Sequence, residues 1–336
     1  MSGHELIVLG GSAGGVEALS HIVADLPADL PAAVCAVIHM PADGPALLVE
    51  VLARAGRMRT LRASDGMPIE RGCFYVPPPD HHLLVELGHL RVVHGPKENG
   101  FRPAVDALFR TAARAYGPRV VGVILTGMLD DGTAGLLAIK RRGGVALVQD
   151  PYEALFPSMP QSALRYVVVD AVVPLAEIGP ALVRLAYTSP GTEAALAGTP
   201  AHEPEVAPQS LPPDLRVHVQ ANVPLTCPEC GGVLTESYDG ELLRFHCLAG
   251  HSYSRESLVE QQSQALDYTL WSAYNALSER VLLAHRLMDD AATLGDKVSR
   301  RRFESLANQA QHQRDQISRA FTAGQELKDQ KEEEGP

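Results

Sequence analysis

Three kinds of reactive side chain follow apolar runs in the first half of the chain. Ser12 lies in ELIVLGGSAGGVEAL, His39 follows VCAVI, and the pair Asp130 and Asp131 follows VVGVILTGML. A serine hydroxyl becomes a strong nucleophile when an imidazole takes its proton, and a carboxylate orients that imidazole and stabilises its charged form. These residue types therefore fit a nucleophilic Ser-His-Asp site, provided that the fold brings them together.

The glycine-rich turn around Ser12 has two interpretations. Glycines on both sides permit a tight turn and close approach of a substrate, and the N–H groups of a following helix could stabilise an oxyanion. The same turn could bind a phosphate, and the serine could simply cap the helix. His39 is also open to a structural reading, because the chain has 13 histidines and a histidine after a strand is more often a hydrogen-bonding residue.

The elements expected to position these residues alternate between strands and helices. Short β-branched runs predict buried strands at 6–9, 34–38, 120–125, 145–148 and 167–173, and helical spacing covers 16–26 and 105–116. This alternation predicts an α/β fold, a doubly wound, mostly parallel sheet with helices on both faces. Active sites in such sheets form just outside the carboxyl ends of the strands, so Ser12, His39 and the pair Asp130 and Asp131 are expected to meet there.

A second cluster of chemically competent residues lies near the C-terminus. Cys227 and Cys230 form C-x2-C, and Cys247 and His251 form C-x3-H after a spacer with a hairpin pattern. Four such ligands suit tetrahedral zinc in a small ribbon-like module. His246 is an alternative fourth ligand, and a reduced cluster without metal is the competing interpretation. A closed set of four ligands leaves no position for a reactive water, so the predicted zinc is structural, and no cofactor is expected for catalysis.

The composition changes along the chain predict five parts: a catalytic domain at 1–188, a Pro/Ala-rich linker at 189–222, the zinc-ribbon-like module at 223–254, a helical hairpin at 255–325 and a disordered charged tail at 326–336. Apolar residues recur at three-and-four spacing in both helices of the hairpin. Trp271 and Tyr274 on the first helix fit either its core or a contact with a partner.

Bulk composition restricts the function classes. The chain has 336 residues, 46% of them hydrophobic, and a net charge of -11. An acidic chain without a dense basic cluster disfavours nucleic-acid binding, and no apolar run approaches the length that spans a bilayer. The five cysteines include three close together, which fits a metal site in a reducing compartment. We therefore expect a cytoplasmic protein without membrane insertion.

Several further motifs occur in order: GGSAGG, VIHMP, RPAVDALF, GVILTGMLDDGTAGLLAIKRRGG and QDPYEALFPSMPQSAL. Together they resemble the catalytic domain of the chemotaxis protein-glutamate methylesterases over residues 1–188. The resemblance implies Ser12 as nucleophile, His39 as general base and Asp131 as orienting acid, with Asp130 as a neighbour. It implies hydrolysis of glutamate methyl esters on cytoplasmic helices of a chemoreceptor, with possible deamidation of glutamine, and N–H groups near Ala13 or Met128 around the oxyanion.

The sequence is also compatible with other functions and partners. The expected catalytic strand begins near residue 5, so the resemblance predicts a stand-alone form without the receiver domain of the well-known family members. Substrates outside chemotaxis are open, as are a hydrolase of small esters and a regulatory scaffold with an esterase fold. A nucleotide-binding module would place an acidic residue after the second strand, where His39 stands. The C-terminal region is expected to bind a signalling partner or a second copy.

Overall fold

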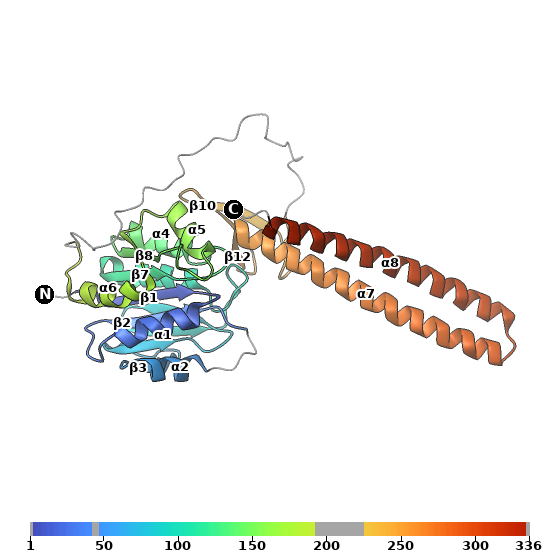
Figure 1. Cartoon of the computed structure of the whole chain (residues 1–336), viewed down its shortest axis with the longest axis horizontal. Helices are drawn as coiled ribbons and strands as arrows, with labels where there is room; N and C mark the ends of the chain where they lie inside the picture. The colour runs from blue at the N-terminus through green and yellow to red at the C-terminus, as the bar shows by residue number, and fades with distance from the viewer. Residues whose placement is uncertain (1–2, 42–46, 192–224, 334–336) are drawn as a thin grey trace, which may run out of the picture. The chain divides into compact units, whose positions relative to one another are not determined.

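The computed structural model describes residues 3–41, 47–191 and 225–333 (Figure 1). It divides into two compact units, residues 1–258 and 259–336. The predicted linker at 189–222 lies almost entirely outside the described residues. Within the described ranges, none of the helices combines the length and the apolar character that crossing a bilayer requires.

The first unit is built on a seven-stranded sheet in the order β3-β4-β2-β1-β7-β8-β9, and every neighbouring pair is parallel. The strands are β1 (Leu6–Gly11), β2 (Ala33–Ile38), β3 (Arg59–Arg62), β4 (Cys73–Val76), β7 (Val120–Ile124), β8 (Val145–Gln149) and β9 (Ala171–Val173). The strand order runs outward in both directions from β1 and β7. Their boundary is therefore the topological switch point, where doubly wound sheets form their sites.

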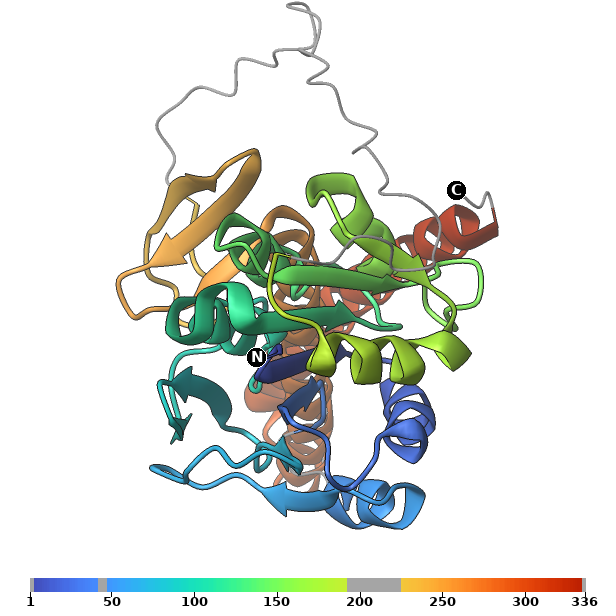
Figure 2. The ribbon, with the colours of Figure 1, turned by 90° about the vertical axis from the view of Figure 1, so that its left-hand side faces the viewer.

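Helices cover both faces of this sheet, as Figure 2 shows. One core contains apolar faces of α1 (Gly15–Asp25), α2 (Leu48–Ala55) and α6 (Leu175–Tyr187). The opposite core contains α3 (Val105–Tyr116), α4 (Thr133–Arg141) and α5 (Ser158–Tyr166). The predicted doubly wound fold is thereby confirmed. Burial of apolar side chains on both faces explains why the central strands read as continuous apolar runs.

Several elements differ from the predictions. The run at 167–173 forms a strand only at Ala171–Val173, because the Val167 N–H still bonds Ala163 at the end of α5 and the Asp170 carboxylate pairs with Lys140. Strands β3 and β4 were not predicted. Neither was the antiparallel hairpin of β5 (His82–Glu86) and β6 (His89–Val93). A 3-10 turn, η1 (Gly117–Arg119), joins α3 to β7.

The Cys/His segment forms a small antiparallel sheet of β10 (Leu234–Asp239), β11 (Leu242–Cys247) and β12 (Ser252–Ser254). We call residues 225–254 the ribbon. It belongs to the first compact unit together with the large sheet. The Asp239 to Leu242 turn contains Gly240 with φ 70°, a conformation that favours glycine in a tight hairpin.

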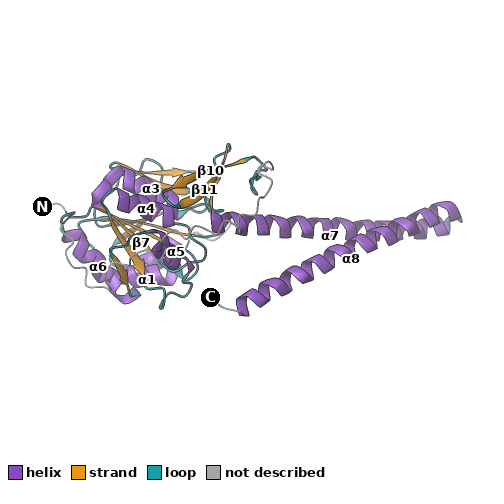
Figure 3. Ribbon diagram, turned by 90° about the horizontal axis from the view of Figure 1, so that it is seen from above, coloured by secondary structure: helices purple, strands orange, loops and turns teal. Residues whose placement is uncertain are grey.

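The second unit contains nearly all of α7 (Arg255–Thr293) and all of α8 (Lys297–Glu333), two long helices joined by a short connection at Gly295 (Figure 3). Trp271 contacts Phe321 edge to face at 6.5 Å, and Arg314 lies over the Tyr274 ring. These contacts make the pair antiparallel and place the two aromatic side chains against the opposite helix. The helix α8 extends to Glu333, beyond residue 325, where the sequence predicted its end.

Candidate active site

Ser12 lies in the turn between β1 and α1, at the carboxyl edge of the sheet. Its N–H donates to the Thr126 carbonyl after β7 at 3.0 Å, and its carbonyl accepts from Gly15 at 2.9 Å. Gly14 begins the turn into α1 with φ 75°, the left-handed region that glycine adopts at little cost. Two hydrogen bonds thus hold the backbone of Ser12, while its hydroxyl has no partner among the described residues.

His39 and Asp131 are in direct contact. The residues before Ser12 and His39, Gly11 and Ile38, are paired in the register of β1 and β2, so both side chains leave the same edge of the sheet from adjacent strands. His39 Nε2 donates to Asp131 Oδ2 at 2.7 Å, and the two side chains are 5% and 0% exposed. His39 Nδ1 is buried and has no hydrogen-bond partner in the described structure. In the neutral ring this nitrogen carries the lone pair, so it is the atom that can accept a proton.

Asp131 is ionised in this setting despite complete burial. Burial opposes its charge, but hydrogen bonds and the charge of His39, together with N–H donors from Val105 and Asn99, hold the pKa of Asp131 below its usual range. The Asp106 N–H adds another bond to Oδ1 at 3.1 Å. The first turn of α3 therefore presents its free N–H groups to this carboxylate, the usual preference of a helix N-terminus for negative charge.

Two residues that contact His39 or Asp131 were missed in the sequence. The ring of Phe101 stacks on His39 with centroids 3.6 Å apart and planes 8° from parallel. The buried amide of Asn99 donates to Asp131 Oδ1 at 2.8 Å and to Asp106 Oδ2 at 2.9 Å. Both lie in the loop ENGFRP, which has neither strand nor helix periodicity. The only available signal was that this polar loop directly precedes the RPAVDALF motif.

Asp130 faces away from His39 and Asp131 toward the ribbon. Its carboxylate accepts from the Ser254 hydroxyl at 2.7 Å. Burial raises the pKa of Asp130 to about 8, and the nearby Glu256 adds to this, although the Ser254 bond acts in the opposite direction. The neutral form is thus favoured at neutral pH. The two adjacent aspartates therefore differ in protonation state: Asp131 is charged beside His39, and Asp130 is protonated.

The loop after β7 supports the serine turn. Thr126 Oγ1 donates to the Ala13 carbonyl at 3.1 Å and its N–H bonds the Gln149 side chain. A Cβ on Gly127 would come within 2.8 Å of Ser12 Cβ, so glycine is required for this close approach. The N–H groups of Ala13 and Met128 have no acceptor among the described residues, which leaves both available to a bound oxyanion.

The four predicted metal ligands converge at one end of the ribbon. One ligand atom from each of Cys227, Cys230, Cys247 and His251 lies within 4.8 Å of all the others. The Cys230 and Cys247 sulfurs are 3.8 Å apart, and His251 Nδ1 lies 3.6 Å and 3.4 Å from the Cys227 and Cys247 sulfurs. His246 is not in this group, since its Nε2 contacts the Ser237 hydroxyl.

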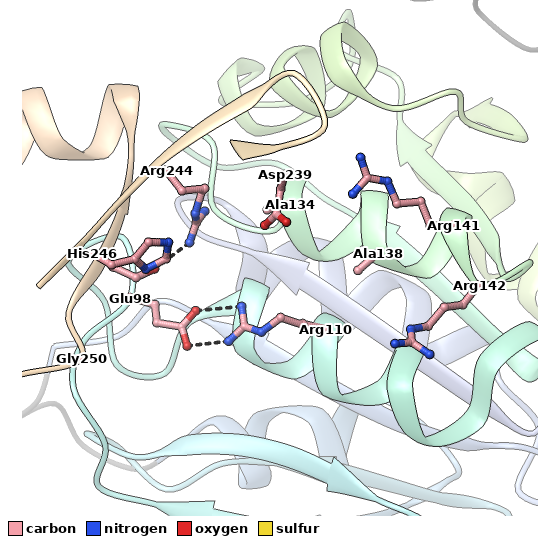
Figure 4. Close-up of a pocket in the computed structure, with 11 residues that line it drawn as sticks. Glu98, Arg110, Ala134, Ala138, Arg141, Arg142, Asp239, Arg244, His246 and Gly250 are labelled. Carbon is pink, nitrogen blue, oxygen red and sulfur yellow. Dashed lines mark hydrogen bonds and ion pairs between the residues drawn. The ribbon is translucent and has the colours of Figure 1, made fainter. Parts of the chain in front are cut away.

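A groove of about 720 Å³ lies between the ribbon and the helices α3 and α4 (Figure 4). Four arginines line it, Arg110, Arg141, Arg142 and Arg244, and the triad residues do not. Arg110 is paired with Glu98 at 2.8 Å, and Arg244 reaches past Ser252 to the buried Asp106. The groove marks the seam along which the ribbon packs on the sheet domain.

Comparison with known proteins agrees with this geometry. Residues 7–182 match the family model described as CheB methylesterase. A protein-glutamate methylesterase/protein-glutamine glutaminase of Moorella thermoacetica is 40% identical over 188 residues, which are 54% of this chain and 44% of that protein. A protein of the same description from Xanthomonas campestris is 41% identical over 184 residues, 54% of this chain and 51% of that protein. The chain thus spans about half the length of these relatives.

Two other relatives align over most of their length. A Leptospira interrogans protein is 37% identical over 183 residues, 54% of this chain and 95% of that protein. The crystal structure of the Thermotoga maritima CheB methylesterase catalytic domain superposes with a TM-score of 0.52 at 32% identity, over 55% of this chain and 100% of that domain. With its seven-stranded sheet and its matched residues at 7–182, this chain belongs to the CheB methylesterase family.

Proposed function

We propose that this protein is a serine-type protein-glutamate methylesterase, in which Ser12 is the nucleophile, His39 the general base and Asp131 the orienting acid. The observation that carries the proposal is the buried contact of 2.7 Å between His39 and Asp131, which leaves an unbonded Nδ1 on the strand next to Ser12. A base with one nitrogen bound to a carboxylate and the other unbonded beside a serine is the arrangement that nucleophilic acyl transfer needs.

The reaction follows from these roles. Ser12 Oγ attacks the ester carbonyl carbon while its proton passes to His39 Nδ1. The tetrahedral intermediate expels methoxide, which takes this proton and leaves as methanol, and a Ser12 acyl ester remains. A water then gives its proton to His39 and attacks the acyl carbon, Ser12 regains its proton, and the glutamate carboxylate is released. Asp131 stabilises the imidazolium in both steps, and the Ala13 and Met128 N–H groups are proposed for the oxyanion.

The same steps accommodate glutamine. Ammonia would leave in place of methanol, with His39 as the proton donor to the departing nitrogen, so we propose glutamine deamidation as a side activity. The proposed substrate is a methylated helix of a chemoreceptor or of a similar signalling protein, in the cytoplasm. The names of the Moorella and Xanthomonas relatives mention glutamate and glutamine of proteins, which supports a protein substrate.

We also propose a structural zinc ion at Cys227, Cys230, Cys247 and His251. With zinc–sulfur bonds of about 2.3 Å, sulfurs at two corners of a tetrahedron are about 3.8 Å apart, and the Cys230 and Cys247 sulfurs have this spacing. The bound ion would cross-link the two ends of the ribbon. Because all four positions belong to the protein, the ion would take no part in the hydrolysis.

The proposed domain organisation keeps the boundaries expected from the sequence up to the helical pair: a catalytic domain at 1–188, a linker, the ribbon and an antiparallel helix pair. The long α7 and α8 expose large apolar side chains, among them Leu282 and Leu283. These support the proposal that this pair binds a signalling partner or a second copy.

A substrate comparison tests the function against its alternative, a hydrolase of small esters. The full chain is incubated with a methylated chemoreceptor cytoplasmic fragment and, separately, with methyl esters of single amino acids, and methanol is measured in both. We expect kcat/KM to be higher for the protein substrate. Efficient hydrolysis of the small esters without methanol from the receptor would reject the protein substrate, and no hydrolysis of either would favour a regulatory scaffold.

A further inference from the structure

Asn99 links the catalytic aspartate to the C-terminal end of the ribbon. Its amide nitrogen donates to Asp131 and Asp106, and its amide oxygen accepts from the Ser254 N–H at 2.9 Å and the Ser257 hydroxyl at 3.2 Å. Only this orientation of the amide matches donors with acceptors. Ser257 is completely buried and lies in the first turn of α7, within the first compact unit.

A second connection runs through a buried ion pair. Arg244 of β11 donates to Asp106 Oδ2 at 2.8 Å, and the two side chains are 5% and 0% exposed. Asp106 also accepts from the Gly132 and Gly135 N–H groups at the start of α4. Two buried carboxylates that share one amide repel each other. Burial raises the pKa of Asp106 and Asp131 adds to this, whereas the Arg244 guanidinium of the ribbon acts in the opposite direction and favours the charged form of Asp106.

A third connection is made by the backbone. The Asn99 N–H donates to the Ser252 carbonyl at 2.7 Å, and Glu98 pairs with Ser252 in a parallel bridge. Glu98 and Phe101 are joined by two reciprocal backbone bonds of 3.1 Å and 2.9 Å. The same short loop therefore carries Asn99 against Asp131 and Phe101 against the His39 ring, and β12 holds this loop from outside.

We propose that the ribbon and the first turn of α7 position the catalytic centre: Arg244 and Ser254 of the ribbon and Ser257 of α7 fix Asn99 and the loop 97–101, and through them the Asp131 carboxylate and the His39 ring. This inference rests on the proposed function of the site. The ribbon residues touch no reacting atom, so they act as positioning residues. The catalytic geometry then depends on a module more than ninety residues after the triad in the sequence, and the ribbon is part of the working enzyme.

A purely structural interface and a positioning device differ in what their loss changes. Loss of an interface lowers the free energy of unfolding and the fraction of active molecules. Loss of a positioning device also changes the rate at which Ser12 reacts in each folded molecule. It further changes the pH below which His39 no longer acts as the base. The test therefore measures per-site reactivity against pH, and it separates the charge of Arg244 from its packing.

The experiment uses the full chain, as wild type and as Arg244→Gln, Arg244→Lys and Arg141→Gln. Arg141 lines the same groove (Figure 4) and has no ion pair among the described residues, so Arg141→Gln is the matched control for charge. The probe is a fluorophosphonate: Ser12 Oγ displaces fluoride from phosphorus while its proton passes to His39. A second readout, the NMR titration of the His39 ring, needs no turnover and is assigned with His39→Gln.

We expect Arg244→Gln to lower the labelling rate by about tenfold or more, because misplacement of a reacting group by 1 Å can cost ~10²-fold. The acid limb of the rate profile and the His39 titration should move to higher pH, since Asp131 and Asp106 then act on the ring without the opposing cation. Arg244→Lys should restore the position of the acid limb and part of the rate, and Arg141→Gln should match wild type.

A folded Arg244→Gln protein with wild-type labelling rate and titration would overturn the inference. If Arg244→Gln does not fold, Ser257→Ala replaces it: this change removes one donor to Asn99 and should slow labelling, and an unchanged rate would reject the proposal. Absence of Ser12-dependent labelling in the wild type would instead reject the proposed function. The His39 titration would then decide the inference alone, upheld by a shift in Arg244→Gln and rejected by its absence.

Discussion

At the scale of single residues, His39 is held by contacts of two kinds. Its edge bonds Asp131 and its face stacks on Phe101 at 3.6 Å. Aromatic pairs contribute about 0.5–1.5 kcal/mol beyond their buried area, which is a factor of about 2 to 10 in rate when it acts on the transition state. Phe101→Leu should therefore lower kcat for methanol release by about this factor and leave KM nearly unchanged.

The control for this change is Tyr152→Leu, because the Tyr152 side chain is 98% exposed and its loss should leave both constants unchanged. A Phe101→Leu enzyme with raised KM and unchanged kcat would show that the ring binds substrate and does not orient the base.

Asp130 gives a prediction about stability and pH. Its folded pKa of about 8 is above the value of about 3.9 in an unfolded chain. Between these values the folded state holds the proton that the unfolded state releases, so this residue lowers the free energy of unfolding as pH rises from 4 to 8. One pKa unit corresponds to about 1.4 kcal/mol, so the loss should reach several kcal/mol at pH 8.

Urea unfolding at pH 5 and pH 8 checks this prediction with Asp130→Asn, whose side chain does not ionise. The variant should gain stability relative to wild type at pH 8 and much less at pH 5. An equal difference at both values would mean that Asp130 does not titrate in this range.

The triad candidates could be proposed from the sequence because each follows a strongly apolar strand, and in parallel sheets strand ends share one edge. The choice of Asp131 over Asp130 depended on the family resemblance, since adjacent aspartates have the same local pattern. Asn99 and Phe101 could not be found in this way. They lie in a loop whose shape depends on Ser252, and no local spacing encodes a contact with a residue so far along the chain.

At the scale of elements, the loop after β7 fixes the position of Ser12, the proposed nucleophile. A Cβ on Gly127 would lie 2.8 Å from Ser12 Cβ and 3.0 Å from Ser12 N. It would also collide with Met159 Sδ. Gly127→Ala should therefore shift the serine turn and lower kcat by about 10²-fold, the cost of a displacement near 1 Å.

Gly95→Ala is the matched control, because a Cβ at Gly95 has its nearest contact at an ordinary 3.6 Å. Methanol release by both variants, compared with their unfolding curves, separates a displaced nucleophile from lost folding. Wild-type kcat in a folded Gly127→Ala protein would contradict the assigned position of Ser12.

The elements found from the sequence are those with long apolar runs, and the four-residue strand β4 was missed although it is buried. The central strands and α3 have apolar patterns that the fold must bury, and they were predicted within one or two residues at most ends. The edge strand β3 reads RTLR and is half exposed, so its sequence has no apolar run to detect. The strand β9 was predicted too long because Val167 and Val169 are buried without pairing as a strand.

At the scale of the whole molecule, the proposed zinc site and the proposed positioning role of the ribbon together give a prediction about metal removal. If zinc cross-links Cys227 and Cys230 to Cys247 and His251, its removal should unfold the ribbon and release Arg244, Ser254 and Asn99. Treatment of the full chain with a chelator should lower methanol release in proportion to the zinc lost, and added zinc should restore it. Full activity in a metal-free chain would separate the metal site from the catalytic centre.

The ribbon also shows what the sequence could not predict about domain organisation. The four ligands and their hairpin were visible as a separate module after a linker. The docking of that module against Asn99, Asp106 and Asp130 was not visible, because it depends on single polar side chains in loops and at helix ends. Its consequence is that the proposed chemistry of one half of the chain has to be tested in the presence of the other half.

The central claim is that Ser12 attacks a glutamate methyl ester, and methanol release from a methylated chemoreceptor cytoplasmic fragment tests it most directly. The measurement compares the full wild-type chain with Ser12→Ala and with Ser20→Ala, whose hydroxyl only bonds the Val16 carbonyl. The account predicts that Ser12→Ala lowers kcat by about 10³-fold or more and that Ser20→Ala retains wild-type activity. Equal methanol release by wild type and Ser12→Ala would contradict it.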